Sequence, residues 1–306
     1  MTFLPEKILI GSRASPLAKA QTRIFIEKFI NIFGKEKEKN LSLNFVKAHG
    51  DKNLNNNLFS KGNKGIFTKE LDQAQIEGEI DLSIHSMKDL PSFLPKELEL
   101  VAVLNRDDPR DAVYSLKEVD LSSLKKNSVI GTSSIRRSIQ IKHKFPNLNI
   151  KPIRGNVGTR IKKLENNDFD ALVLASAGLR RLGILSNFKP ISSDLIIPAA
   201  GQGIIALIAR KNDDLIKKIA KRLNHNKSFF EGKCERLFLH ILDGSCETPI
   251  GVNAALTKEN SNELVKFKYF VSTIKGTQSF SGDMVFKKSE SEEEITKLSL
   301  TLKQKL

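Results

Sequence analysis

The stretch DLSIHSMKDLP, at residues 81–91, lies at the centre of the predicted fold and of its candidate site. It begins as a strand, because the apolar residues Leu82 and Ile84 alternate with polar ones. It then gathers ionisable side chains and ends at Pro91, which has no N–H group to extend a strand ladder. Ligands gather at strand ends in α/β proteins. Taken alone, these residues favour a simpler interpretation, a strand that runs into an ordinary turn.

The composition is that of a globular protein. The chain has 306 residues, 40% of them hydrophobic and 28% charged, which is enough for two domains or three small ones. Residues 1–13 contain no long apolar segment, and no apolar run approaches the length of a membrane span, so we expect a cytoplasmic protein. Two cysteines argue against a disulfide framework. We expect no metal site. We also expect a monomer, because no long exposed apolar helix face stands out.

The formal net charge of +15 has three explanations: a lysine-rich solvated surface, nucleic-acid binding, or a small polyanionic ligand. Several arginines stand beside Gly, Ser or Thr, where a guanidinium can grip a carboxylate or phosphate with two hydrogen bonds. No basic stripe is interleaved with aromatic residues, so we favour the small anion and expect no nucleic acid. These arginines are Arg13, Arg136, Arg137, Arg154 and Arg160.

Two of the arginine groups coincide with predicted helix N-termini, where free N–H groups and the helix dipole attract anions. Arg13 and Ser15 stand between a strand at 7–12 and a helix that begins at Ser15-Pro16. Ordinary helix capping is the alternative there. The second group is the stronger signal, because two arginines in a first helical turn are unfavourable unless an anion binds. It comprises Thr132, Ser133, Ser134, Arg136 and Arg137.

Strand and helix patterns alternate along the first two thirds of the chain, which predicts an α/β fold with mostly parallel sheets. A second unit begins near residue 128, and a strand at 203–210 is expected to rejoin the first unit, which gives two crossings. Antiparallel strand patterns and a closing helix near the C-terminus predict a small α+β domain. The predicted domains are 1–104 with 197–219, then 105–196, then 220–306.

Nine short motifs occur in order along the chain. They are GSRASPLA (11–18), GIFTKEL (65–71), HSMKDLP (85–91), DDPRDA (107–112), GTSSIRRS (131–138), RGNVGTR (154–160), AGLRRLG (177–183), PAAGQG (198–203) and a cysteine loop ahead of PIG (249–251). In this order they resemble the porphobilinogen deaminase (hydroxymethylbilane synthase) family. The resemblance covers the chain from Gly11 to the closing helix. It implies two domains akin to periplasmic binding proteins, joined by two crossings, and a third domain that bears a cysteine.

The resemblance also implies a reaction. Four porphobilinogen molecules, which are small anionic pyrroles, condense stepwise with release of ammonia, and water frees the linear hydroxymethylbilane. The growing chain extends a dipyrromethane cofactor joined through a thioether to the loop cysteine, here Cys246. The other cysteine, Cys234, is expected to be a small packed residue.

Roles follow residue by residue from the matched motifs. Asp89 is the expected catalytic carboxylate, which stabilises the cation left when ammonia departs and, secondarily, moves protons. His85 is expected to be mainly structural. The expected cofactor-binding residues are Cys246, Lys88, Ser86, Arg136, Arg137, Ser133, Ser134, Thr132, Arg160 and Asp51. The expected substrate-binding residues are Arg13, Ser15, Arg154 and Gln202.

Two other classes of protein compete with this interpretation. A non-catalytic anion-binding protein could use the same two-domain scaffold, because fold alone never proves function. Cys246 argues against it, since a simple binding protein has no need of a reactive cysteine on an extra domain. A nucleic-acid-binding module rests on the +15 charge alone and would bind in a strongly salt-dependent manner.

Overall fold

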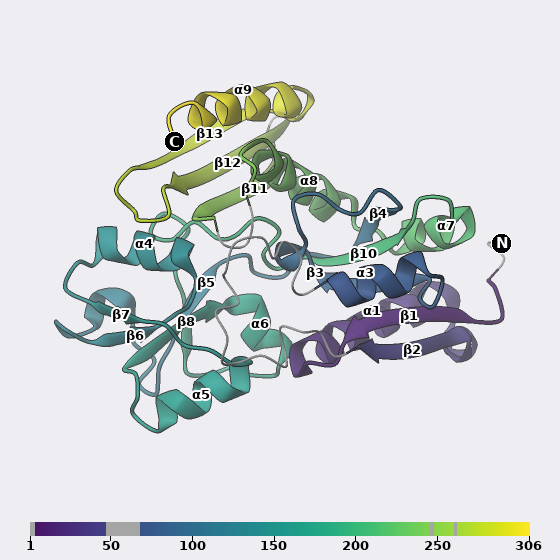
Figure 1. Cartoon of the computed structure of the whole chain (residues 1–306), viewed down its shortest axis with the longest axis horizontal. Helices are drawn as coiled ribbons and strands as arrows, with labels where there is room; N and C mark the ends of the chain where they lie inside the picture. Colours follow the sequence, from purple (N-terminus) through teal and green to yellow (C-terminus); the bar gives the residue numbers. More distant parts are fainter. Residues whose placement is uncertain (1–3, 47–67, 245–247, 260–261) are drawn as a thin grey trace. The chain divides into compact units, whose positions relative to one another are not determined.

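The structure is a computed structural model that describes residues 4–46, 68–244, 248–259 and 262–306 (Figure 1). The chain divides into two compact units. The first comprises Met1–Arg106 and Ile204–Phe230, and the second comprises Asp107–Gly203 and Glu231–Leu306. The division into three domains with the bounds given above stays a prediction. No helix of the described part is long and apolar enough to span a membrane.

A five-stranded sheet forms the centre of the first unit, in the order β2-β1-β3-β10-β4. Strand β1 pairs in parallel with β2 and β3, whereas β10 is antiparallel to both β3 and β4. Four strands therefore run one way, and only β10, which arrives after the second crossing, runs the other way. The strands are β1 (Ile8–Arg13), β2 (Leu41–Val46), β3 (Leu82–Ser86), β4 (Leu98–Val103) and β10 (Ile205–Arg210).

Helix α1 (Pro16–Phe33) begins where the sequence predicts it. The side chain of Ser15 accepts a hydrogen bond from the N–H of Ala18, and a proline occupies the first turn. Buried Phe25 and Phe29 follow at helical spacing and pack on the sheet together with α7 (Asp214–Leu223). Helix α3 (Lys69–Ile76) contacts β1, β3 and β10, and its Leu71 and Ala74 form a separate apolar cluster with Ile80. Short 3-10 helices occur at η1 (Lys35–Asn40) and η2 (Met87–Asp89).

The second unit repeats this design without repeating the sequence. Its five-stranded sheet has the order β7-β6-β8-β5-β9, with β6 parallel to β7 and β8, and β5 antiparallel to β8 and β9. Again the reversed strand follows a crossing, so the predicted α/β class, the mostly parallel sheets and the two crossings are confirmed. The strands are β5 (Asp111–Tyr114), β6 (Val129–Gly131), β7 (Asn149–Lys151), β8 (Ala171–Ala175) and β9 (Phe188–Pro190).

Part of one sequence motif lies inside this sheet. The last two residues of the DDPRDA motif, Asp111 and Ala112, belong to β5, because the buried Ala112, Val113 and Tyr114 complete the sheet beside β8. The remaining elements of this part are η3 (Leu121–Ser123), α4 (Ile135–Lys144), α5 (Val157–Glu165) and α6 (Ser176–Arg181).

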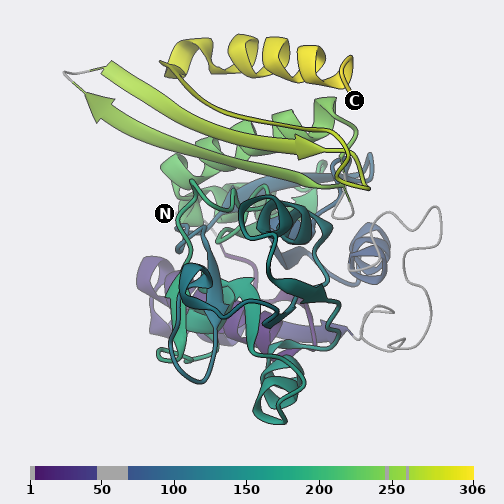
Figure 2. The same ribbon diagram turned by 90° about the vertical axis from the view of Figure 1, so that its left-hand side faces the viewer.

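Three long antiparallel strands form the C-terminal sheet, as the alternating patterns predict. Phe238 of the preceding helix packs edge-on against Phe267 of the middle strand, with ring centroids 5.5 Å apart. Figure 2 shows the last helix running beside the strands, and it contacts β13. The elements are α8 (Asn226–Ile241), β11 (Ile250–Glu259), β12 (Asn262–Ser272), β13 (Ser279–Lys287), η4 (Lys288–Glu290) and α9 (Ser291–Lys303).

The end of the second unit's first segment depends on a glycine. Gly203 has φ +89°, and a Cβ atom there would lie 2.4 Å from the carbonyl oxygen of Asp107. The carbonyl of Gly203 accepts a hydrogen bond from the N–H of Asp107 at 3.0 Å. The two crossing segments therefore approach each other at a distance that only glycine allows.

We expect Gly203→Ala to lower the stability of the protein more than Gly183→Ala does. Both glycines have positive φ, but a Cβ at Gly183 meets nothing within 4 Å. The control should therefore lose only the about 1–2 kcal/mol of backbone strain. Gly203→Ala adds a clash that costs on the order of 1–3 kcal/mol more. Urea unfolding midpoints measure the difference, and equal midpoints for the two variants would contradict the close approach.

Candidate active site

A small pocket in the first unit lies where β3 ends and α1 begins. Arg13 at the end of β1 and Ser15 at the N-cap of α1 line it, together with Ser86 and Asp89 from the end of β3 and the turn that follows. Four predicted site residues are thus brought together. Lys88 belongs to the same turn and is half-buried, but it is not among the residues that line the pocket.

Buried anchors fix the turn that carries Asp89. The N–H of Met87 donates to the carbonyl of Ile204 at 3.0 Å, and both Met87 and Leu90 are buried. Gln21 of α1 donates its side-chain N–H to Oγ of Ser86 at 2.7 Å. Within the described residues, the half-buried carboxylate of Asp89 takes no hydrogen bond and no ion pair. A carboxylate held this way beside an open pocket is available to a cationic or N–H-bearing ligand.

A chain of buried polar side chains connects α3 to β3 and includes His85, which lines the pocket. Oγ of Ser83 lies 2.7 Å from Oε1 of Gln75 and 2.9 Å from Nε2 of His85. Burial lowers the pKa of His85 to about 4, and the charge of Arg13 lowers it further in the same direction. His85 is therefore uncharged at neutral pH.

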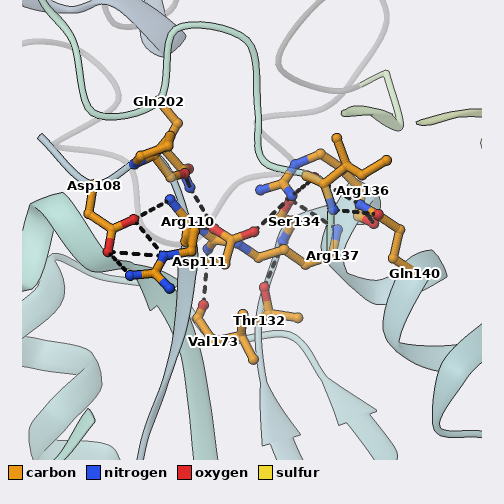
Figure 3. A network of polar contacts seen from close by, with 12 residues as sticks. Asp108, Arg110, Asp111, Thr132, Ser134, Arg136, Arg137, Gln140, Val173 and Gln202 are labelled. Carbon is orange, nitrogen blue, oxygen red and sulfur yellow. Dashed lines mark hydrogen bonds and ion pairs between the residues drawn. The ribbon is translucent and has the colours of Figure 1, made fainter. Parts of the chain in front are cut away.

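Two of the predicted arginines of the second unit, Arg136 and Arg137, pair with one carboxylate, that of Asp111 in β5 (Figure 3). Its side chain is fully buried. Oδ2 accepts from Nη1 of Arg136 at 2.8 Å, and Oδ1 accepts from Nη2 and Nε of Arg137 at 2.6 and 3.0 Å. Nε2 of Gln202 donates to the same Oδ1 at 2.8 Å. Burial alone would raise the pKa of Asp111, but the two guanidinium groups outweigh it and hold that pKa far below its usual range.

The three predicted hydroxyl groups of this region contact the backbone. Ser134 caps α4 by accepting from the N–H of Arg137 at 3.4 Å, and Thr132 accepts from the N–H of Ser134 at 3.3 Å. Ser133 donates to the carbonyl of Ile153 at 2.6 Å. In this structure these side chains fix the turn that presents the arginines.

Arg160 adds a third guanidinium to the cluster. Its Nε donates to the carbonyl of Gly155 at 2.8 Å, and no carboxylate of the described residues pairs with it. Burial lowers the pKa of Arg160 to about 10, and the nearby charge of Arg137 adds to the effect. The cluster thus holds three guanidinium groups and one carboxylate, so it has a surplus of positive charge that suits a ligand with several carboxylates. Arg154 lies half-buried in the turn before α5.

Two predicted residues, Asp51 and Cys246, lie outside the described residues. The other cysteine, Cys234, is buried in α8. Burial raises the pKa of its thiol to about 12, with a further contribution from Glu235. Since the thiolate is the nucleophile, Cys234 is poorly suited to form a covalent bond.

Sequence reasoning missed three polar residues that position the site. Asp111 was quoted only as part of a motif, although two arginines near a helix N-terminus call for a counter-charge. Gln21 and Gln140 looked like ordinary helix residues. Gln140 accepts from the N–H of Ile197 at 2.8 Å and donates to its carbonyl at 3.1 Å, and that carbonyl also accepts from Arg136. No local sequence pattern marks such long-range contacts.

Two like α/β sheets, with arginines and a carboxylate at strand and helix ends, are typical of proteins that bind small anionic ligands. The model of the family "Porphobilinogen deaminase, dipyromethane cofactor binding domain" matches residues 8–218, and "Porphobilinogen deaminase, C-terminal domain" matches residues 229–306. The chain belongs to the porphobilinogen deaminase family. Its activity is that of this family, the formation of hydroxymethylbilane from porphobilinogen on a dipyrromethane cofactor.

Relatives match along most of the chain. The porphobilinogen deaminase of Syntrophomonas wolfei is 39% identical over 302 residues, covering 98% of this chain and 96% of its own. That of Halalkalibacterium halodurans is 41% identical over 281 residues, covering 90% and 87%. The chloroplastic porphobilinogen deaminase of Pisum sativum is 43% identical over 257 residues, covering 83% and 70%.

We expect Asp111→Asn to destabilise the protein by about 3–5 kcal/mol, because it leaves two buried guanidinium groups without their charge partner. Asp108→Asn is the matched control, since its partner Arg110 is largely exposed and the pair should contribute about 0–1 kcal/mol. Urea unfolding at pH 7 measures both. A loss for Asp111→Asn no larger than that of the control would contradict a structural role for this ion pair.

The same pair predicts a pH dependence. Because the pKa of Asp111 is depressed on folding, its contribution is complete above its unfolded pKa of about 3.9 and is lost as the pH falls through the folded value. The stability difference between the unsubstituted protein and Asp111→Asn should therefore be constant above about pH 5 and narrow below about pH 4. Urea midpoints of both proteins from pH 3 to 8 test this, and a gap that widens in acid would refute it.

Proposed function

We propose that this chain carries its dipyrromethane on Cys246 and uses Asp89 to stabilise the cation that forms on the substrate. The proposed attachment at Cys246 rests on the different chemistry of the two cysteines. Cys234 is buried, and its raised pKa keeps the thiol protonated. Cys246 follows a glycine and a serine in the sequence, and it is the other cysteine of the chain.

The cofactor, when bound, supplies the terminal pyrrole carbon from which the new chain grows. The surplus positive charge around Asp111 supports the binding of the cofactor by the second unit, because the acetate and propionate groups of each ring need cationic partners. Arg136, Arg137 and Arg160 would hold those carboxylates. Thr132, Ser133 and Ser134 support them by fixing the turn, and Ser86, Lys88 and Asp51 complete the proposed set.

In the first unit, we propose that Arg13 and Ser15 bind the carboxylates of the incoming porphobilinogen. The pocket that they share with Asp89 supports this role, since a guanidinium and a helix N-terminus both favour anions. Asp89, without a described side-chain partner, would stabilise the cation that remains when ammonia leaves, and secondarily move protons. Arg154 and Gln202 are the remaining proposed substrate residues, and the hydrogen bond from Gln202 to Asp111 supports an indirect part for that side chain.

We also keep three predictions from the sequence as proposals: a cytoplasmic location, a monomer, and three domains bounded at 1–104 with 197–219, 105–196 and 220–306. Sedimentation velocity of the purified protein tests the monomer.

Intact-mass measurement with peptide mapping tests the attachment site. We expect added mass equal to two linked pyrroles on the Cys246 peptide, before or after incubation with porphobilinogen. Cys246→Ser should gain no mass under the same conditions, whereas the control Cys234→Ala should load normally, because its thiol is buried and protonated. Loading of Cys246→Ser would place the thioether elsewhere. An unsubstituted chain that stays unmodified after porphobilinogen would favour a non-catalytic anion-binding protein.

The role of Asp89 is tested with a variant that keeps its shape. We expect Asp89→Asn to fold and to carry the cofactor but to lose about 10²–10³-fold in turnover, the typical loss when one stabilising group is removed. Mass spectrometry establishes loading, and steady-state formation of hydroxymethylbilane measures turnover. Near-normal turnover by the loaded variant would exclude this role.

A further inference from the structure

The hydrogen bonds that connect α3 to β3 fix the proton positions around His85. Nε2 of Gln75 donates to two backbone carbonyls, those of Asp81 at 3.0 Å and Ile208 at 2.7 Å. Carbonyl oxygens only accept, so the amide orientation of Gln75 is fixed and its Oε1 must be an acceptor. The hydroxyl of Ser83, 2.7 Å away, therefore donates its single proton to Oε1 of Gln75.

This arrangement determines which ring nitrogen of His85 carries the proton. Because the proton of Ser83 is already used, the 2.9 Å contact between Oγ of Ser83 and Nε2 of His85 requires that Nε2 donate. A neutral imidazole protonated on Nε2 has a bare lone pair on Nδ1. No described residue donates a hydrogen bond to Nδ1, although the side chain is buried and His85 lines the pocket with Arg13 and Asp89. Its low pKa agrees with the neutral form.

We infer that Nδ1 of His85 accepts a hydrogen bond from the N–H of a pyrrole ring bound in this pocket. The inference rests on the proposed function of the pocket. It replaces the mainly structural role predicted for His85 from the sequence with direct contact to the reacting molecule.

The charges around the pocket favour a pyrrole N–H over the other groups of the substrate. Carboxylates are drawn to the guanidinium of Arg13, and a developing cation is drawn to the carboxylate of Asp89. A neutral acceptor such as Nδ1 offers nothing to an anion and is a weaker partner than Asp89 for a cation. The pyrrole N–H is a neutral donor that is costly to bury unpaired, and Nδ1 satisfies it.

Two substitutions separate the two nitrogens of His85. In His85→Gln the side-chain amide reaches the position of Nε2, so it can keep the bond to Ser83 while no atom replaces Nδ1. In His85→Asn the amide reaches the position of Nδ1 but loses Ser83. We expect His85→Gln to keep the melting temperature and to lose roughly 2- to 12-fold in kcat/KM, the value of one neutral hydrogen bond. His85→Asn should have a lower melting temperature than His85→Gln but should retain more of the kcat/KM of the unsubstituted enzyme.

Unchanged kcat/KM in His85→Gln would overturn the inference, because a histidine needed only for its contact with Ser83 predicts that result. The comparison uses cofactor-loaded enzyme, with loading checked by mass for every variant.

A spectroscopic readout does not depend on how the variants fold. In the unsubstituted holoenzyme with ¹⁵N-labelled histidine, the His85 signals are assigned by their loss in His85→Gln. We expect a protonated Nε2 and a bare Nδ1. We also expect the Nδ1 resonance to shift when the enzyme is saturated, as judged by calorimetry, with an unreactive porphobilinogen analogue that has hydrogen in place of the amino group. A proton on Nδ1, or an Nδ1 resonance whose chemical shift does not change when the analogue binds, would overturn the inference.

The outcomes separate this inference from the proposed function. A chain that never loads at Cys246, or a loaded Asp89→Asn variant with normal turnover, defeats the proposed function. A loaded and active enzyme in which Nδ1 does not respond to the analogue defeats only the role of His85.

Discussion

The second unit depends on one buried carboxylate. Asp111, on the reversed strand of its sheet, accepts hydrogen bonds from Arg136 and Arg137 in the first turn of α4 and from Gln202 near the second crossing (Figure 3). It thus joins three segments that are far apart in the sequence. Burying two guanidinium groups and one carboxylate is favourable only while all three are paired. Once Arg160 is included, this group of side chains has more positive than negative charge. The ion pairs that hold the second unit together therefore also leave positive charge that suits an anionic ligand.

The two units prepare different environments for a ligand. The second unit offers surplus cationic charge, which recognises carboxylates but does little for a reacting centre. The first unit brings Asp89, whose carboxylate has no described partner, together with Arg13 and the uncharged His85 in the lining of one pocket. In the proposed function, anchoring and chemistry therefore use separate groups. The segment that carries Ser86 and Asp89 is held by the buried hydrogen bonds of Met87 and Gln21.

Much of the fold could be predicted because its signals are local. The alternation in β3, the capping by Ser15 and the apolar spacing of α1 each involve residues within a few positions. The class of ligand followed from arginines beside turns. What escaped prediction is long-range: Asp111 pairs with side chains about 25 positions away, and Gln75 orders Ser83 and thereby His85 across a helix and a strand. Short strands such as β5 and β9 also carry too few residues to show a period.

The strand order has a consequence for synthesis on the ribosome. Among the described strands, β4 at residues 98–103 pairs only with β10, and β10 is not made until residues 205–210. The sheet of the second unit needs nothing beyond residue 190. The sheet of the first unit therefore stays incomplete until β10 is made, whereas all strands of the second unit's sheet are made before that. This is the reverse of the usual order, in which N-terminal domains finish folding first. An unpaired strand exposed for that interval is a site for association with other nascent chains, so this topology ties the yield of folded enzyme to the speed of translation between β4 and β10.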